Sequence, residues 1–188
     1  MSEHQQLPTA LYRAEQVREL DRCAIQDHGV PGINLMRRAG EAAFECLRQR
    51  YPEARSLSIW CGSGNNGGDG YIIAGLARRR GFTVQLVQVG AGGKAGGDAG
   101  LALDWAREQG VEFTEFNEAV LPEGQLIVDA LLGTGLTGEV RGDFKLAIES
   151  LNGSSLSLFA IDIASGLCSD SGVRLGATGD HGKPCLWV

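Results

Sequence analysis

The chain opens with two stretches in which apolar residues recur at helical spacing. Residues 12–28 place apolar side chains such as Leu20 on one face, and Gly29 follows as a natural stop. Residues 34–50 repeat this pattern, and Pro52 lies just past their end. The spacing therefore predicts two helices before any strand.

Beyond residue 55 the pattern changes to short apolar runs that alternate with helical stretches. Apolar runs of this kind are typical of parallel strands that are covered on both faces and joined by helical crossovers. The pattern predicts an α/β fold: a three-layer α/β/α, Rossmann-like sandwich with a mostly parallel sheet and two extra N-terminal helices. The predicted strands are residues 56–60, 82–89, 111–116, 125–132 and 157–163, and the predicted helices between them are residues 71–80, 98–109 and 143–152.

The end of the chain departs from this alternation. Residues 177–188 show no strong periodicity, although a sheet of this kind would usually continue. We therefore expect residues 1–188 to form a single domain that is altered at its C-terminal strands or lacks them.

Composition and charge narrow the class of protein. The net charge of −6 argues against a nucleic-acid surface, and no apolar run approaches the ~18 residues of a membrane span. The five cysteines show no CxxC or CxxH spacing, and their odd number favours reduced thiols over a disulfide framework. The N-terminus "MSEHQQLP" does not resemble a signal peptide. We expect a cytoplasmic protein with neither nucleic acid nor a membrane as partner.

A glycine-rich stretch, "CGSGNNGGDG" at residues 61–70, follows the first predicted strand and contains the spacing GxGxxG. A glycine loop that leads into a helix presents free backbone N–H groups to an anion, typically a phosphate. The dinucleotide fingerprint also needs an acidic residue about 20 residues further on, to hold a ribose hydroxyl. The second predicted strand instead carries Gln85 and Gln88. The fingerprint of a hydride-transferring enzyme is therefore incomplete.

Other polar residues of the glycine-rich stretch point elsewhere. Asn65, Asn66 and Asp69 supply oxygen ligands or hydrogen bonds beyond the needs of a tight turn, although Asn-Gly is also a common turn dipeptide. After the second strand, residues 90–100 carry Lys94, either in a solvated loop or in a lid that pairs with a phosphate.

Two aspartates stand in or at the end of later apolar strands. An ionised carboxylate such as Asp129 is costly in an apolar strand unless it is paired, hydrogen-bonded or bound to a cation. Asp162 ends the last predicted strand, so both carboxylates can face one crevice, where they suit cation binding or acid–base chemistry. Ser165 fits either a nucleophile or a helix N-cap. The three histidines lie far from it in sequence, which disfavours a Ser–His–Asp triad.

Three segments together carry a family resemblance: "GSGNNGGDGYIIAGLARRRG", "VDALLGTGLTGEVRGDF" and "AIDIASGL", in this order. With them the chain resembles the NAD(P)H-hydrate epimerase family, the YjeF N-terminal domain. The resemblance implies a Rossmann-like fold, commonly dimeric, that interconverts the R and S epimers of hydrated NADH and NADPH. It also implies a functional partner, a ribokinase-like dehydratase, which in bacteria is often part of the same polypeptide.

The resemblance also assigns roles to residues of this chain. It implies a potassium ion, and we take hydrated NAD(P)H as substrate rather than cofactor. Our hypothesis is that Asp162 is the acid–base group for loss and return of the C6 hydroxyl, with Asp69 as second candidate. The residues implied to bind substrate are Asn65, Asn66, Gly67, Gly68, Asp69, Gly133, Thr134, Gly135, Leu136, Thr137, Gly138, Glu139 and Asp162, and those implied to hold potassium are Asn66, Asp129 and Ser165.

The chain departs from the family where "DIPSGLD" is usual, because Ala164 stands in place of proline and Cys168 in place of aspartate. The alternative function is a non-catalytic, dimeric nucleotide-binding or scaffold module of the same fold. Retention of all the polar site residues favours the enzyme, because a scaffold has no need for all of these side chains: Asn66, Asp69, Asp129, Asp162 and Ser165.

Overall fold

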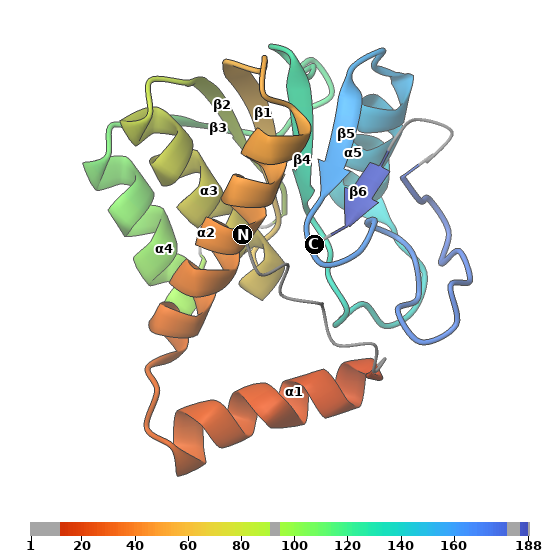
Figure 1. Ribbon diagram of the computed structural model, residues 1–188. Helices are drawn as coiled ribbons and strands as arrows, with labels where there is room; N and C mark the ends of the chain where they lie inside the picture. The colour runs from red at the N-terminus through yellow and green to blue at the C-terminus, as the bar shows by residue number, and fades with distance from the viewer. Residues whose placement is uncertain (1–11, 91–94, 180–184, 188) are drawn as a thin grey trace, which may run out of the picture.

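The computed structural model of the protein describes residues 12–90, 95–179 and 185–187. Strands and helices alternate along most of the chain after two leading helical segments (Figure 1), which confirms the predicted α/β fold. The elements in order are α1 (Ala14–Arg22), the π-helical η1 (Cys23–Asp27), α2 (Gly32–Arg50), β1 (Ser56–Cys61), α3 (Asn65–Arg79), β2 (Thr83–Gln88), α4 (Gly97–Glu108), β3 (Phe113–Glu115), β4 (Leu126–Ala130), α5 (Gly142–Gly153), β5 (Ser157–Ala160) and β6 (Cys185–Trp187).

The sheet has the order β3-β2-β1-β4-β5-β6, and every neighbouring pair is parallel. The chain therefore builds outward from β1 in one direction and then returns to add β4 on the other side. In open parallel sheets, ligands bind beyond the carboxyl ends of the strands at the point where the strand order reverses. That point here lies between β1 and β4.

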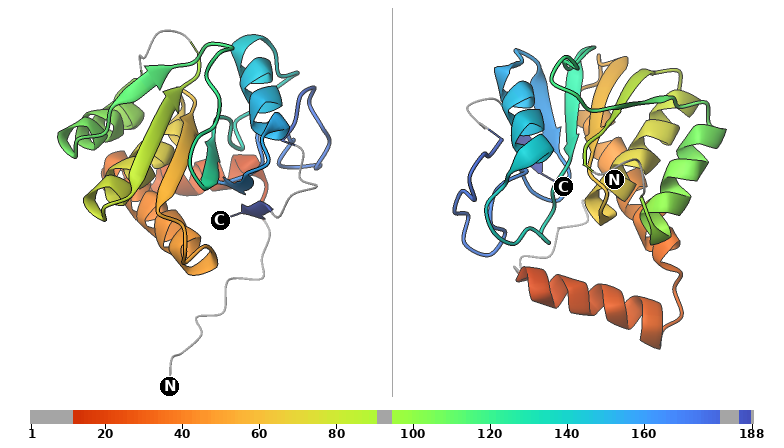
Figure 2. Two further views of the ribbon diagram at one scale, coloured as in Figure 1. Left: turned by 90° about the horizontal axis from the view of Figure 1, so that it is seen from above. Right: turned by 180° about the vertical axis from the view of Figure 1, so that it is seen from behind.

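Apolar side chains cover both faces of the sheet, as the apolar strands predicted. Ile59 packs with residues of α2, α3 and α4 in one cluster, and the next residue, Trp60, packs with residues of α5 in another. Figure 2 shows α5 on the opposite side of the sheet from α2, α3 and α4. Burial of each large side chain contributes about 1.5–3 kcal/mol, so both clusters hold the strand ends in place.

Glycines set the close spacing within the three-helix layer. A Cβ at Gly40 of α2 would lie 2.6 Å from the Ile72 Cγ2 of α3, and one at Gly75 of α3 would lie 2.4 Å from the Trp105 ring of α4. Side chains at these two positions would force the helices apart.

The start of α3 differs from the prediction. The sequence pattern predicted a loop through residue 70, whereas α3 begins at Asn65, so "NNGGDG" forms its first turns. Glycine costs about 1 kcal/mol in a helix, and this cost disguised the helix start. Packing nevertheless requires glycine here, because a Cβ at Gly67 would lie 1.9 Å from the Gly62 carbonyl oxygen.

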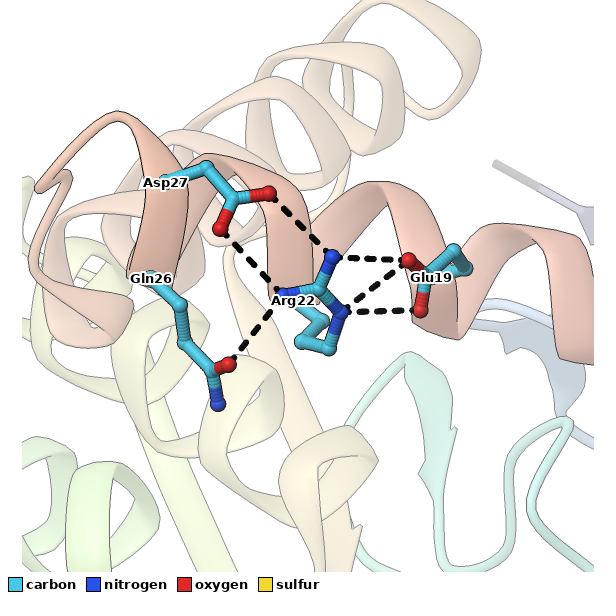
Figure 3. A network of polar contacts seen from close by, with 4 residues as sticks. All are labelled: Glu19, Arg22, Gln26 and Asp27. Carbon is cyan, nitrogen blue, oxygen red and sulfur yellow. Dashed lines mark hydrogen bonds and ion pairs between the residues drawn. The ribbon is translucent and has the colours of Figure 1, made fainter.

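The two ends of the described chain also hold differences from the prediction. Residues 185–187 form β6, which pairs with β5 with Leu158 opposite Cys185, although the pattern indicated no strand there. The predicted helix 12–28 is divided into α1 and η1. There Arg22 bridges Glu19, Gln26 and Asp27 (Figure 3).

Helix α1 crosses the end of the molecule toward which β5 points (Figure 1). Its first residue is tethered by a hydrogen bond of 3.0 Å, in which the Ala14 N–H donates to the Asp170 carboxylate. No helix within the described ranges is long and apolar enough to cross a membrane.

Candidate active site

The glycine-rich stretch turns sharply from β1 into α3 at Gly62. The Gly62 N–H donates to the Ala130 carbonyl at the end of β4 (3.0 Å), which ties the loop to the neighbouring strand. The turn brings Asn66 to the carboxyl edge of the sheet, where its side chain is 8 % exposed. Neither amide atom of Asn66 has a hydrogen-bond partner within the described residues. A buried amide without partners is costly, so this one is suited to receive a ligand.

Asp129, near the end of β4, is almost completely buried. Its Oδ1 accepts hydrogen bonds from the Leu131 N–H (3.1 Å) and the Ser165 hydroxyl (2.6 Å), and its Oδ2 accepts one from the Ser165 N–H (3.0 Å). The Ser165 Oγ in turn accepts from the Leu132 N–H (2.9 Å). The carboxylate thus joins the loops that follow β4 and β5.

This geometry removes both sequence interpretations of Ser165. The residue is fully buried, so its hydroxyl, which donates to Asp129, is out of reach of a substrate and does not serve as a nucleophile. In the described part of the chain no helix begins after it, so the N-cap prediction is wrong.

Asp162 projects from the loop after β5. Its φ of 59° makes it the one non-glycine residue with a left-handed backbone in the described ranges. Aspartate tolerates this conformation better than most residues, yet it still carries strain, and strained residues cluster at functional sites. The Thr134 N–H donates to the Asp162 Oδ2 (2.7 Å), which fixes the carboxylate over the loop after β4.

Gly133 lets two other candidate residues, Asp162 and Asn66, come close together. A Cβ on Gly133 would lie 2.5 Å from the Asp162 Oδ2 and 3.1 Å from the Asn66 Cβ. The absence of a side chain at this position therefore lets β4's loop, α3 and the loop after β5 meet.

Asp69 completes the group of acidic residues. Burial, together with the negative charges of Asp162 and Asp21, raises the pKa of Asp69 to about 7. A carboxyl group with this pKa holds its proton in part at neutral pH, which suits a general acid. Asp21 lies on α1, and no motif in the sequence pointed to it.

The rest of the second glycine loop extends away from this group. Glu139 is exposed and pairs with Arg141 (3.0 Å), and its Cγ packs beside Gly176. Lys94 lies outside the described residues. The sequence-predicted residues that lie at the carboxyl edge around Gly133 are Asn66, Asp69, Asp129, Thr134, Asp162 and Ser165.

The glutamines of β2 have partners of their own. Gln85 accepts from the Ser58 hydroxyl and the Glu123 N–H, and Gln88 donates to the Tyr71 hydroxyl (3.0 Å). The strand therefore offers no carboxylate at the place where a dehydrogenase would hold a ribose.

The oxygen-rich composition of the site also limits the metals it suits. No group of three or more His, Cys, Asp or Glu side chains in the described part of the chain could hold a metal ion. Carboxylate, amide and hydroxyl oxygens, such as those of Asp129, Asn66 and Ser165, suit hard cations instead.

The arrangement of glycine loops and carboxylates matches a known family. The family model described as YjeF-related protein N-terminus matches residues 32–179. The chain belongs to this family. The YjeF-related match includes each of the acidic residues Asp69, Asp129 and Asp162.

Curated relatives of this chain carry two kinds of name. The bifunctional NAD(P)H-hydrate repair enzyme Nnr of Coxiella burnetii is 41% identical over 87% of this chain, but over only 33% of its own length. The NAD(P)H-hydrate epimerase of Rhodobacter capsulatus is 34% identical over 94% of this chain and 85% of its own length. The chain thus spans about a third of the first relative and most of the second.

A solved structure supports the fold. The crystal structure of yeast ynu0 superposes with a TM-score of 0.75, at 18% identity, over 85% of this chain and 72% of that chain. This likeness, at such low identity, concerns the fold alone.

Proposed function

We propose that this chain is an NAD(P)H-hydrate epimerase, which interconverts the R and S forms of hydrated NADH and NADPH. The observation that carries the proposal is the meeting of Asp162 and the unpartnered Asn66 amide at Gly133, with Asp69 near enough for the charge of Asp162 to raise its pKa. The names of the relatives support the same activity, including that of a relative covered over most of its length. A non-catalytic scaffold would gain nothing from a strained aspartate beside a protonated one.

The two aspartates supply the proton transfers that epimerisation at C6 requires. Protonated Asp69 gives its proton to the C6 hydroxyl, the C–O bond breaks, and the ring nitrogen lone pair forms the C6–N1 double bond as water leaves. Water then adds to the opposite face of C6, and the Asp162 carboxylate accepts the proton released. Return of this proton to Asp69 resets the pair, and the charge of Asp162 contributes to the raised pKa of Asp69 that lets it take the proton back.

The two glycine loops form the substrate cradle. Residues 65–69 begin α3, whose first N–H groups and helix dipole favour a diphosphate. Residues 133–139 contact Asp162 at their beginning, where the Thr134 N–H donates to its carboxylate. The nicotinamide ring would then lie between the loops, within reach of both carboxylates.

The residues present fit a potassium ion. Asp129 is a buried carboxylate with neutral hydrogen-bond donors around it. The buried Asn66 amide has no hydrogen-bond partner within the described residues. Asn66, Asp129 and Ser165 would hold the ion through oxygen atoms. When bound, the ion offsets the charge of Asp129 and orients the loops that carry the site.

Two partners belong to the proposal. One is a second copy of the chain, as a homodimer, and the other is a ribokinase-like NAD(P)H-hydrate dehydratase that consumes one epimer. The greater length of the bifunctional relatives supports a dehydratase on the same polypeptide.

The test uses separated epimers of hydrated NADH. We expect the chain to accelerate their equilibration, followed by chromatography, more strongly in potassium than in tetramethylammonium chloride. Asp162→Asn should abolish this acceleration and keep the circular dichroism spectrum. An inactive wild-type chain that still binds hydrated NADH would favour the scaffold instead.

A further inference from the structure

A buried polar pair lies beneath the glycine-rich loop and has no part in the chemistry above. Gln88 is the last residue of β2, and its Nε2 donates to the hydroxyl of Tyr71 (3.0 Å), which lies two turns into α3. The Tyr71 hydroxyl donates in turn to the Gly62 carbonyl oxygen (3.4 Å). Both side chains are buried, with Gln88 5 % and Tyr71 1 % exposed.

The pair reaches a crowded junction. A Cβ at Gly62 would lie 2.1 Å from the Leu131 carbonyl oxygen, and one at Gly67 would lie 1.9 Å from the Gly62 carbonyl oxygen. The Gly62 peptide therefore touches both the loop after β4 and the first turn of α3. Any rotation of this peptide would disturb the two loops that carry the site.

Packing alone does not account for the pair. Phenylalanine and leucine would fill nearly the same space without burying polar atoms, whereas the Gln88 Oε1 has no partner within the described residues. A buried acceptor without a donor destabilises the fold. The chain tolerates this cost at a place where a side-chain donor reaches the Gly62 carbonyl of the glycine loop.

The geometry of the peptide bond shows what the hydrogen bond does. In a trans peptide, the carbonyl of one residue and the N–H of the next point in opposite directions. Holding the Gly62 carbonyl inward against Tyr71 therefore turns the Ser63 N–H outward. Ser63 is exposed at the mouth of the loop, just before α3 begins. Its N–H becomes a fixed donor for an anionic ligand.

We propose that Tyr71 and Gln88 are positioning residues that lock the Gly62–Ser63 peptide in the orientation that binds the diphosphate of the substrate. This inference rests on the proposed epimerase function. The same peptide could otherwise flip, because glycine permits both orientations. The pair thus pre-organises the anion site before substrate arrives.

The first experiment measures kcat and KM of Tyr71→Phe. A diphosphate contact acts equally in ground and transition states, so KM should rise about tenfold while kcat stays within about twofold. Ser58→Ala is the matched control. It removes a buried hydroxyl that bridges Trp60 and Gln85 away from the glycine loop, and should lower the denaturation midpoint without changing KM.

The double variant Tyr71→Phe, Gln88→Leu separates positioning from stability. Removing both polar groups should restore much of the denaturation midpoint, because neither is left unpaired, yet KM should stay high. A KM that returns to the wild-type value together with the midpoint overturns the proposal, as does an unchanged KM in Tyr71→Phe.

A second readout does not depend on activity. Amide hydrogen exchange of Gly62, whose N–H donates to the Ala130 carbonyl (3.0 Å), should accelerate at least tenfold in Tyr71→Phe and stay unchanged in Ser58→Ala when it is followed by NMR. If the wild-type chain fails to epimerise hydrated NADH, the proposed function fails, while this exchange and the affinity for inorganic pyrophosphate still decide the role of the pair. Unchanged exchange in Tyr71→Phe overturns that role.

Discussion

At the residue scale, the aspartates of the site show that the surroundings of a carboxyl group, rather than its residue type, determine its properties. Asp129 is held by backbone and hydroxyl donors, while Asp69 is held in a half-buried place beside other negative charges. The two carboxyl groups therefore have different surroundings. Sequence singled out both residues, but the raised pKa of Asp69 depends in part on Asp21 of α1, which only the fold brings near.

Asp69 should make the protein less stable as pH rises. The pKa of Asp69 is raised in the folded state to about 7, from an ordinary value of 3.8. Between these values the native state binds more protons than the unfolded state, so stability falls through this window and levels off above pH 7. Asp69→Asn removes the effect and should stabilise the protein at pH 8 by up to about 4 kcal/mol, but not at pH 4.

Urea denaturation of both proteins between pH 4 and pH 8 measures this difference. Glu149→Gln is the control, because Glu149 lies on α5 in an exposed pair with Lys145. Parallel curves for wild type and Asp69→Asn would contradict the raised pKa.

Cys168 shows how a substitution within the family pattern can keep a local role. Hydrogen bonds from the Ser171 side chain and from the backbone of Asp170 and Ser171 lower the pKa of the Cys168 thiol. The sulfur thus accepts bonds at the position where the family usually has an aspartate. We expect Cys168 to react with iodoacetamide at a lower pH than an ordinary thiol, and Ser171→Ala to move the pH midpoint upward. Mass spectrometry of the modified peptide measures the alkylation rate of wild type and of Ser171→Ala across pH. Identical pH midpoints in the two proteins would rule out the role of Ser171.

At the element scale, α3 is where propensity and packing disagree. The apolar periodicity from residue 71 predicted the body of the helix, but three glycines hid its first turns. What decides the start is contact: Gly62 bonds to Ala130 of β4, and Gly67 packs on Gly62. The contact with Ala130 joins residues far apart in sequence, and the contact of Gly67 with Gly62 depends on the turn between them, so apolar periodicity reveals neither.

Two glycine substitutions at the start of α3 should have opposite consequences. Gly67→Ala would place a Cβ 1.9 Å from the Gly62 carbonyl oxygen, whereas a Cβ at Gly64 meets no atom within 4 Å. Gly67→Ala should therefore lower the free energy of unfolding by about 3 kcal/mol and weaken substrate binding. Gly64→Ala, at the N-cap, should cost less than about 1 kcal/mol. Urea denaturation compares the two variants, and equal losses would show that the contact is not decisive.

At the scale of the whole molecule, the parallel sheet explains why so much of the site was predictable. Carboxyl ends of parallel strands share one edge, so residues that follow strands, such as Asp129 and Asp162, were expected to meet. The sequence pattern missed β6, because it has three residues and no helix lies between it and β5 among the residues that the structure describes. The same pattern did not indicate the hydrogen bond between Tyr71 and Gln88, since the two buried side chains come from different elements and meet only in the fold.

The proposed potassium site makes a prediction about the stability of the entire fold. An ion that binds only the native state stabilises it in proportion to the logarithm of its concentration, by about 2.7 kcal/mol at a hundredfold excess over Kd. The melting temperature should therefore rise with potassium chloride but not with tetramethylammonium chloride at equal ionic strength. Asn66→Ala removes a buried amide that lacks a partner within the described residues, so without potassium it should melt no lower than wild type.

The same variant should lose the response to potassium, because it lacks the amide oxygen. Asn117→Ala serves as control and should keep the response, since Asn117 follows the edge strand β3 and its side chain caps a turn by accepting the Ala119 N–H. A potassium response that persists in Asn66→Ala would remove this residue from the ion site and leave Asp129 and Ser165 as its remaining side chains. Loss of both response and stability in Asn66→Ala would mean that its amide serves the fold rather than the ion.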